Sequence, residues 1–187
     1  MTKAWFNVRR AAQVAAYFAK AEGGEINVLK LVKLIYLADR LAMEKYDYPL
    51  LFDRLVSMDH GPVDSLTFAY INGCQDDRSE WEKFITDRSN YSVGLANSAL
   101  SEVDFDQLSE ADLEVLACTW SSFGNMTKYQ IRDYTHAHCP EWEDPDGSSL
   151  GIPYERVFKF LGKRDSQLLA QRIMEKRRID EVFAGGA

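Results

Sequence analysis

The sequence lacks the features that mark secreted and membrane-spanning proteins. Its three cysteines, Cys74, Cys118 and Cys139, are an odd number at wide spacing, so no disulfide framework is implied and a reducing cytoplasm is the expected location. No stretch reaches the roughly 18 consecutive apolar residues of a membrane span, and residues 1–10 contain no apolar run of the signal-peptide type. We therefore exclude the secreted, membrane-spanning and collagen-like classes.

Positive charge is also scarce. The 22 lysines and arginines are outnumbered by 29 aspartates and glutamates, which gives a net charge of −7. A chain this acidic is a poor general binder of phosphate backbones and anionic membranes. Two predicted helices around Gly124 and Asn125 are arranged like a helix-turn-helix, but the second carries two cations and one acid, so nucleic acid is not an expected partner.

Helical periodicity runs through most of the chain and predicts a mainly α fold. Apolar residues recur at helical spacing over residues 3–22, and residues 28–46 are apolar almost all round, as is typical of a central, buried helix. Two capping boxes, at residues 109–112 and 127–130, each open a further helix. The predicted helices cover residues 3–22, 28–46, 65–71, 109–123, 127–135, 153–161 and 166–183. Asn27 caps the second, Asp64 or Ser65 caps the third, and Pro153 starts the sixth.

Short extended segments complete the predicted fold. Residues 51–58 form an extended piece, and small and β-branched residues over 91–103 predict a β-hairpin. We expect a compact single helical domain with a small β-hairpin or short sheet, over residues 1–161. Residues 162–187 are predicted to be a basic C-terminal helix followed by a frayed tail.

Asp39 is the first candidate functional residue, because it lies on a mostly apolar face of the helix over residues 28–46. A buried carboxylate is costly unless it is paired and hydrogen-bonded. The structural expectation is an ion pair with Arg54, or a carboxylate that accepts backbone N–H bonds near Gly61. The functional alternative is a perturbed acid or a contact to a partner.

A second face of the same helix carries cations. Lys30, Lys33, Leu37 and Arg40 share this face. It is either a solvated edge of the helix or a cationic stripe that faces an acidic partner. Both alternatives stay open, because the rest of the helix is too apolar to face water.

The sequence His60-Gly61-Pro62 predicts a rigid corner. Glycine permits unusual backbone angles and proline fixes φ, so the imidazole is held in a definite place. Loops of defined geometry commonly bind partners, whereas a histidine in a turn is more commonly just exposed.

Residues 136–139 bring two histidines and a cysteine together. A zinc site normally needs four ligands in paired spacings, and here the fourth ligand would come from a distant part of the chain, so we predict no metal or cofactor. Nothing marks the cysteine as an activated nucleophile, and the sequence contains no phosphate loop, GxSxG or dinucleotide fingerprint. The alternative class is an enzyme that uses Asp39, His60, His136 and Cys139.

Two motifs resemble those of a known family, the Panacea-domain antitoxins, which include SocA-like antitoxins. The sequence LKLVKLIYLADR at residues 29–40 resembles the signature helix of that family. The sequence MDHGPV at residues 58–63 resembles its second signature, a Gly-Pro-Val corner after a short strand. The match extends over residues 3–161, where Leu116, Gly124, Thr127, His136 and residues 140–142 fit the helical second half.

The resemblance implies a non-enzymatic, cytoplasmic antitoxin that binds a cognate toxin protein. SocA-like members act as proteolytic adaptors that deliver the toxin to the ClpXP protease, whereas other members form a direct complex; this lone domain with a helical tail is similar to the SocA-like type. The candidate toxin contacts are Lys33, Tyr36, Asp39, Arg40, Arg54 and His60. The candidate protease contacts are Arg172, Lys176, Arg177, Arg178, Val182 and Phe183. The alternative for this tail is a helix that packs its apolar side against the protein and frays at its end.

Overall fold

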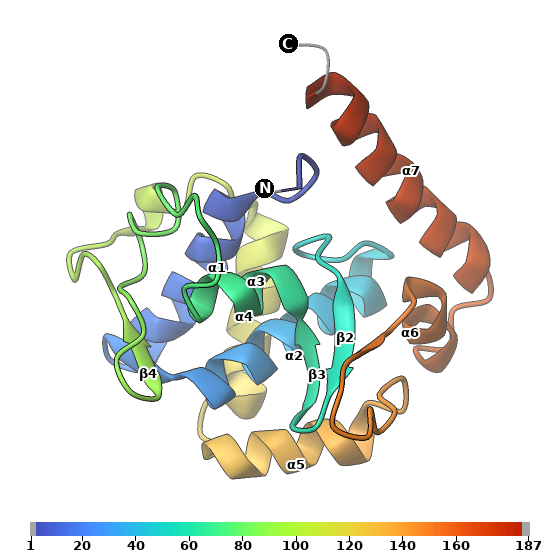
Figure 1. Ribbon diagram of the computed structural model, residues 1–187, viewed down its shortest axis with the longest axis horizontal. Coiled ribbons are helices and arrows are strands. Elements are labelled where there is room, and N and C mark those ends of the chain that lie inside the picture. The colour runs from blue at the N-terminus through green and yellow to red at the C-terminus, as the bar shows by residue number, and fades with distance from the viewer. Residues whose placement is uncertain (1–2, 185–187) are drawn as a thin grey trace.

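The computed structural model describes residues 3–184 and confirms the mainly α prediction (Figure 1). The helices along this part of the chain are α1 (Val8–Ala21), α2 (Val28–Tyr46), α3 (Ser65–Ile71), α4 (Glu110–Phe123), α5 (Lys128–His138), α6 (Tyr154–Phe160) and α7 (Ser166–Ala184), with a short 3₁₀ turn at Glu102–Asp104. No helix of the described chain is long and apolar enough to cross a membrane.

The strands form two small antiparallel sheets. The first pairs β1 (Glu25–Asn27) with β4 (Ser92–Gly94), and the second has the order β3 (Gly61–Asp64), β2 (Leu55–Met58), β5 (Leu150–Gly151). The predicted hairpin over residues 91–103 is wrong, because its strand β4 pairs instead with β1, where Val93 lies opposite Ile26. Both of these side chains are buried, and burial of the pair sets the register of this sheet.

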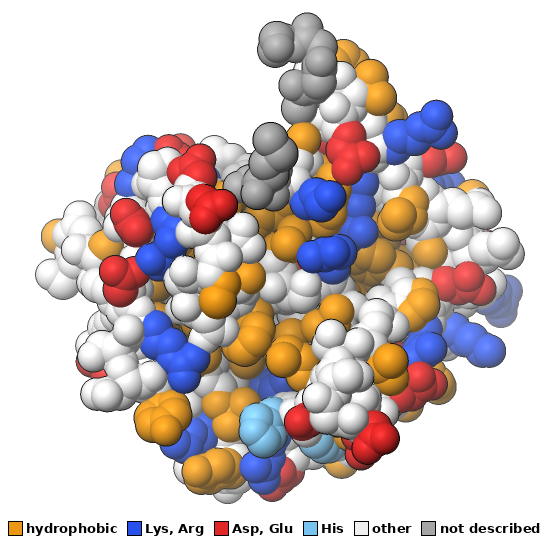
Figure 2. Space-filling model, in the orientation of Figure 1, with side chains coloured by type: hydrophobic (Ala, Val, Ile, Leu, Met, Phe, Trp, Pro, Cys, Tyr) orange, Lys and Arg blue, Asp and Glu red, His pale blue; other side chains and the backbone are white. Residues whose placement is uncertain are grey.

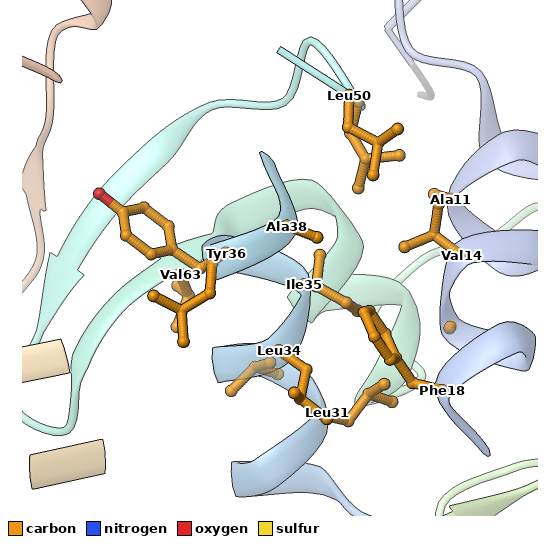
Figure 3. Packing of buried hydrophobic residues seen from close by; sticks show 14 of the residues in the cluster. Ala11, Val14, Phe18, Leu31, Leu34, Ile35, Tyr36, Ala38, Leu50 and Val63 are labelled. Carbon is orange, nitrogen blue, oxygen red and sulfur yellow. The ribbon is translucent and has the colours of Figure 1, made fainter. Parts of the chain in front are cut away.

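Helix α2 lies at the centre of the fold, as predicted, and its observed bounds equal the predicted ones. The side chain of Asn27 caps it by accepting a hydrogen bond from the amide of Leu29 over 3.0 Å. Figure 3 shows Phe18 of α1 facing Ile35 of α2, while Tyr36 points to the opposite side. Helix α2 also packs against α4, α5 and β3, so its near-uniform apolar character follows from having neighbours on every side.

Some helix ends differ from the prediction. Helix α1 begins at Val8 instead of residue 3, because the side chain of Asn7 accepts a hydrogen bond from the amide of Arg10 over 2.9 Å. Helix α5 continues to His138, about one turn further than predicted. Pro153 lies immediately before α6 instead of inside it. Both predicted capping boxes are present.

Asp64 is the N-cap residue of α3, as predicted, but it does not supply the cap's hydrogen bond. Instead, the carboxylate of Asp53 accepts hydrogen bonds from the amides of Leu66 and Thr67, over 2.9 and 2.8 Å, and from the Thr67 hydroxyl over 2.7 Å. The helix start is therefore satisfied by a residue that lies far from it in the sequence.

The predicted C-terminal helix is α7, and its far end projects from the body of the molecule (Figure 1). Leu169 and Ile173 are buried, and the helix packs against α6. Val182 and Phe183, in contrast, are 67% and 78% exposed. The fraying is predicted for residues 184–187. Ala184 is the last residue of α7, and residues 185–187 lie outside the described part of the chain.

Candidate functional site

Lys33 of α2 holds the corner between β2 and β3. It is fully buried, and its Nζ donates a hydrogen bond to the carbonyl oxygen of Pro62 over 2.8 Å. Burial lowers the pKa of Lys33 from 10.5 to about 7, against the opposing effects of Cys139 and Asp64 nearby. Burial also raises the pKa of Asp64 well above its usual value. The amine beneath the corner therefore gains and loses its proton near neutral pH.

Gly61 brings the same corner close to α5. Its φ of +95° lies in the region that favours glycine. A Cβ at this position would come within 2.9 Å of the Thr135 hydroxyl oxygen and 3.0 Å of the His136 ring. The unusual backbone expected of the glycine is thus present, and the adjacent His60 is exposed. The corner presents this histidine to solvent from a tightly packed base.

Tyr36 and Arg40 of α2 meet at one buried carboxylate. The Tyr36 hydroxyl and the Arg40 Nε each donate a hydrogen bond over 2.7 Å to the same oxygen, Oε1 of Glu141. Glu141 is fully buried, and the Arg40 side chain is 18% exposed. Burial, with Glu141 beside it, raises the pKa of Tyr36 well above 10. These two residues of the signature helix therefore fix the loop after α5.

Asp39 does not form either of the two contacts expected of it. Its Oδ1 accepts a hydrogen bond from the amide of Leu51 over 2.7 Å, whereas Arg54 is exposed. Burial raises the pKa of Asp39 from 3.8 to about 7, and Asp53 raises it further, against the hydrogen bond from Leu51. The predicted Arg54 ion pair and the predicted bonds near Gly61 are both wrong, because the chain turns back after α2 and places the amide of Leu51 at this carboxylate.

The cationic face of α2 is not a solvated edge of the helix. Lys30 is 7% exposed, and its Nζ contacts Glu22 over 2.5 Å and the carbonyl oxygen of Gly124 over 2.7 Å. Lys33 and Arg40 are bound to Pro62 and Glu141 as described above. The predicted solvated edge is therefore wrong, because each cation has an acceptor within the fold on another segment. Contact with a partner stays a prediction for Arg40, whose side chain is 18% exposed.

The six predicted toxin contacts do not form one surface patch. Lys33, Tyr36 and Asp39 are fully buried. Arg54 and His60 are exposed, one before β2 and the other after it, so they lie at opposite ends of that strand. Direct toxin contact by the six residues stays a prediction, and the buried three can influence a partner only through the residues that they position.

Three of the four residues of the alternative enzyme prediction are buried or held in contacts with other parts of the fold. Burial raises the pKa of the Cys139 thiol to about 12, whereas a nucleophilic cysteine needs a lowered pKa. The pKa of His136 is lowered by burial and by Lys33, and its ring stacks on Trp142 with centroids 4.3 Å apart. Asp39 binds the Leu51 turn instead. Over residues 3–184, no three His, Cys, Asp or Glu side chains are placed to hold a metal ion.

Arg177 anchors α7 to the body of the protein, a role that the sequence prediction missed. It is 8% exposed, and its Nη2 donates hydrogen bonds to the carbonyl oxygens of Phe52 and Asp53, over 2.7 and 2.6 Å. Its guanidinium also lies 4.2 Å from the centre of the Trp5 ring. Arg177 is therefore not available to a protease, whereas Arg172, Lys176 and Arg178 are exposed. The i, i+4, i+8 spacing of Leu169, Ile173 and Arg177 is the sequence signal that places it on the packed face.

A pocket of about 500 Å³ opens beside the corner. Its floor is apolar and its rim carries cations and tyrosines. Figure 2 shows apolar side chains across the lower middle of this face, with positive and negative side chains around them. The residues that line the floor and rim include Val28, Val32, Val63, Phe68, His60, Arg88, Tyr91, Lys128 and Tyr129. No local sequence signal unites these residues, because they come from segments that only the fold brings together.

The geometry defines a helical domain whose signature residues build a buried scaffold beneath an exposed corner. The model of the family described as "Antitoxin SocA-like, Panacea domain" matches residues 31–143, from α2 through the corner to the loop that contains Glu141. This is more than half of the chain, so the protein belongs to the SocA-like, Panacea-domain antitoxin family. The matched range is narrower than the residues 3–161 predicted from the motifs. No curated protein and no solved structure gives a significant match to the chain.

Proposed function

We propose that this protein is the antitoxin of a toxin–antitoxin pair and that it neutralises its toxin by binding it as a protein, without catalysis. The observation that carries the proposal is the family match over residues 31–143. Within this range, the buried side chains of α2 bind Pro62, Leu51 and Glu141. They fix a surface instead of assembling reactive groups, which suits a protein that acts by recognition.

The toxin contacts follow from which of the predicted residues reach solvent. His60, Arg54 and the exposed part of Arg40 contact the toxin directly. Lys33 acts indirectly, because it fixes the corner next to His60. In the same way, Tyr36 and Asp39 fix the neighbouring segments and do not reach the toxin themselves.

We further propose that the protein is a cytoplasmic adaptor that delivers the toxin to ClpXP. The supporting observation is the projecting end of α7, where the apolar side chains of Val182 and Phe183 are exposed. Arg172, Lys176 and Arg178 are the exposed cations along the same helix. Arg177 holds the helix in place and makes no contact with the protease. The second candidate, direct inhibition in a stable complex, differs only in this last step.

Coexpression with the product of the neighbouring gene tests the antitoxin role. The neighbour expressed alone is expected to stop growth, and this protein, tagged at its N-terminus, is expected to restore growth and to co-purify with it. A neighbour that is harmless, together with a bait that recovers no partner, contradicts the proposal.

The adaptor step is tested in the same cells with the protease deleted. Toxin is then expected to accumulate and to arrest growth even though the antitoxin is present. The double variant Val182→Asp, Phe183→Asp is expected to do the same in normal cells while still co-purifying with the toxin. Leu168→Asp is the matched control, since Leu168 is a 46% exposed residue of the same helix. Toxin that stays neutralised without the protease establishes direct inhibition.

A further inference from the structure

The pocket beside the corner is built by segments that are distant in the sequence. The first turns of α2 and α5 form two sides, and the turn between β2 and β3 forms a third. Arg88 and Tyr91, just before β4, and Gly147 and Ser148, just before β5, complete the lining. At about 500 Å³, the space lies within the range of sites that enclose a ligand group, and it is large enough for one bulky side chain with its neighbouring backbone.

The floor of the pocket is apolar. Val28, Val32 and Val63 are between 3% and 6% exposed, and Phe68 lies beside them in the lining. Lys33 also belongs to the lining but is fully buried and bound to Pro62. The group that fits the floor is therefore an aliphatic or aromatic side chain, which gains by leaving water.

The rim carries two cations, Arg88 and Lys128, on a molecule of net negative charge. Arg88, Lys128 and His60 surround the opening, with Asp59 as the acid among the lining residues. The whole chain carries a net charge of −7, whereas Arg88 and Lys128 outnumber Asp59 around this pocket. Complementary charge steers association and selects partners, and the matching groups on a partner are carboxylates.

Two exposed tyrosines lie at the edges of the pocket. Tyr91 is 71% exposed and Tyr129 is 54% exposed. Each lies beside a rim cation, with the Arg88 guanidinium 5.9 Å from the Tyr91 ring centre and the Lys128 Nζ 5.1 Å from that of Tyr129. Tyrosine and arginine dominate the energetic centres of protein interfaces. Tyrosines on both sides of an open, apolar floor suit a polypeptide that crosses the pocket from one rim to the other.

From these observations we infer that the pocket is the anchor site for the toxin, and that it takes a peptide segment in which an apolar side chain is flanked by Asp or Glu. The apolar side chain occupies the floor formed by Val28, Val32, Val63 and Phe68. The flanking carboxylates face Arg88 and Lys128, and His60 lies beside them as a further hydrogen-bonding group. The inference rests on the proposed antitoxin function for the identity of the partner, but the peptide chemistry of the pocket can be tested without the toxin.

A display library of random dodecapeptides, selected on the immobilised full-length protein, is the probe. The peptides that are enriched are expected to carry an aromatic or aliphatic residue between acidic ones. The best of them, made with a fluorescent label, is expected to bind the wild-type protein with an affinity that falls as salt is added. Lys128→Glu and Tyr91→Ala are each expected to weaken it about tenfold, a loss above that of most interface residues.

Two control variants separate loss of the pocket from loss of charge or aromatic surface in general. Arg164→Glu reverses an exposed cation elsewhere, and Tyr48→Ala removes a 42% exposed tyrosine elsewhere; both are expected to bind the peptide as the wild type does. Enriched peptides that are basic, or binding that Lys128→Glu and Tyr91→Ala leave unchanged in variants shown by thermal melting to be folded, overturn the inference. So does a selection that enriches no peptide.

The two proposals fail in different ways. If the selected peptide binds the pocket but no neighbouring gene product is toxic, the pocket chemistry holds and the antitoxin function does not. If the toxin co-purifies equally with wild type, Lys128→Glu and Tyr91→Ala, the antitoxin function holds and the toxin anchors elsewhere. Binding of a duplex oligonucleotide that competes with the peptide would assign the cationic rim to nucleic acid and also overturn the inference.

Discussion

The Nζ of Lys33 lies 2.8 Å from the carbonyl oxygen of Pro62, and this hydrogen bond joins the signature helix of the family to its Gly-Pro corner. The two residues are 29 positions apart in the sequence, yet they act as one structural unit. The bond accounts for a lysine in the middle of an apolar helix, because the amine satisfies a carbonyl that is buried with it.

Replacing this amine is expected to change how stability depends on pH. The folded-state pKa of Lys33 is about 7, below its ordinary 10.5, so the unfolded chain binds more protons between these values. The free energy of unfolding of the wild type therefore rises through this window as pH increases. Lys33→Met is expected to flatten that rise in urea denaturation curves measured from pH 7 to 10.

Lys20→Met is the control for this measurement. The Lys20 Nζ also donates to a carbonyl oxygen, that of Leu100, over 2.6 Å, but Lys20 is an exposed residue. This variant is expected to keep the wild-type slope. An equally steep rise in Lys33→Met would show that the amine of Lys33 does not change its protonation on folding.

Asp39 is expected to have the opposite effect over a lower range of pH, where it makes the free energy of unfolding fall as the pH rises. Its folded-state pKa is raised from 3.8 to about 7, chiefly by burial, so the folded chain holds a proton that the unfolded chain has lost. The stabilising effect is full below about pH 4 and disappears as the pH rises to 7. Asp39→Asn keeps an oxygen for the Leu51 amide, and it is expected to lose less stability than the wild type between pH 4 and 7.

Chemical denaturation of Asp39→Asn beside Asp133→Asn tests this expectation. The side chain of Asp133 is 65% exposed on α5, so its replacement is expected to leave the pH profile of unfolding unchanged. Some slope remains in Asp39→Asn, because burial also raises the pKa values of Asp53 and Asp64. If Asp39→Asn and the wild type show the same slope, the carboxylate of Asp39 is ionised in the folded protein throughout this range.

Features that depend on neighbouring residues could be predicted from the sequence. The cap at Asn27 and both ends of α2 follow from apolar periodicity and from residues within one turn of the helix. The capping boxes of α4 and α5 are equally local. The pairing of β4 with β1 is not, because a three-residue strand carries no information about its partner. The cap of α3 by Asp53 likewise depends on how a distant segment folds back.

The same division applies to the candidate site. Lys33 and Asp39 stand out in the sequence because charged residues in an apolar helix need partners. Their partners, Pro62 and Leu51, are set by the path of the chain and could not be read from spacing. The pocket was missed for the same reason, since Arg88 and Lys128 are ordinary surface cations until the fold places them around one opening.

Arg177 is expected to decide whether α7 stays on the body of the protein. It donates to the carbonyl oxygens of Phe52 and Asp53 and lies over Trp5. Arg177→Ala leaves these buried carbonyls without this donor and is expected to lower the free energy of unfolding by about 3 kcal/mol. Hydrogen exchange of the α7 amides is expected to accelerate in the same variant.

Arg178→Ala gives the matched comparison, because Arg178 is the next residue and is exposed. This variant is expected to change stability by no more than about 0.5 kcal/mol and to leave exchange in α7 as it is. Equal effects of the two variants would mean that Leu169 and Ile173 alone hold the helix.

The corner approaches α5 closely at Gly61. Gly61 and Gly162 both have positive φ, +95° and +74°, so alanine strains the backbone at each, by about 1–2 kcal/mol. An added Cβ at Gly162 meets no atom within 4 Å, whereas at Gly61 it comes within 2.9 Å of Thr135. Gly61→Ala is therefore expected to cost about 1–3 kcal/mol more than Gly162→Ala, because the corner must move off the helix.

Denaturation of the two alanine variants measures this difference, and binding measures its consequence. A corner displaced from α5 also moves His60 and the rim of the pocket, so Gly61→Ala is expected to weaken the selected peptide, whereas Gly162→Ala binds it as the wild type does. Equal stabilities would show that the corner relaxes without resistance. In that case the hydrogen bond from Lys33 to Pro62 would not be enough to hold His60 in one place. The buried side chains of α2 would then not fix the corner for binding.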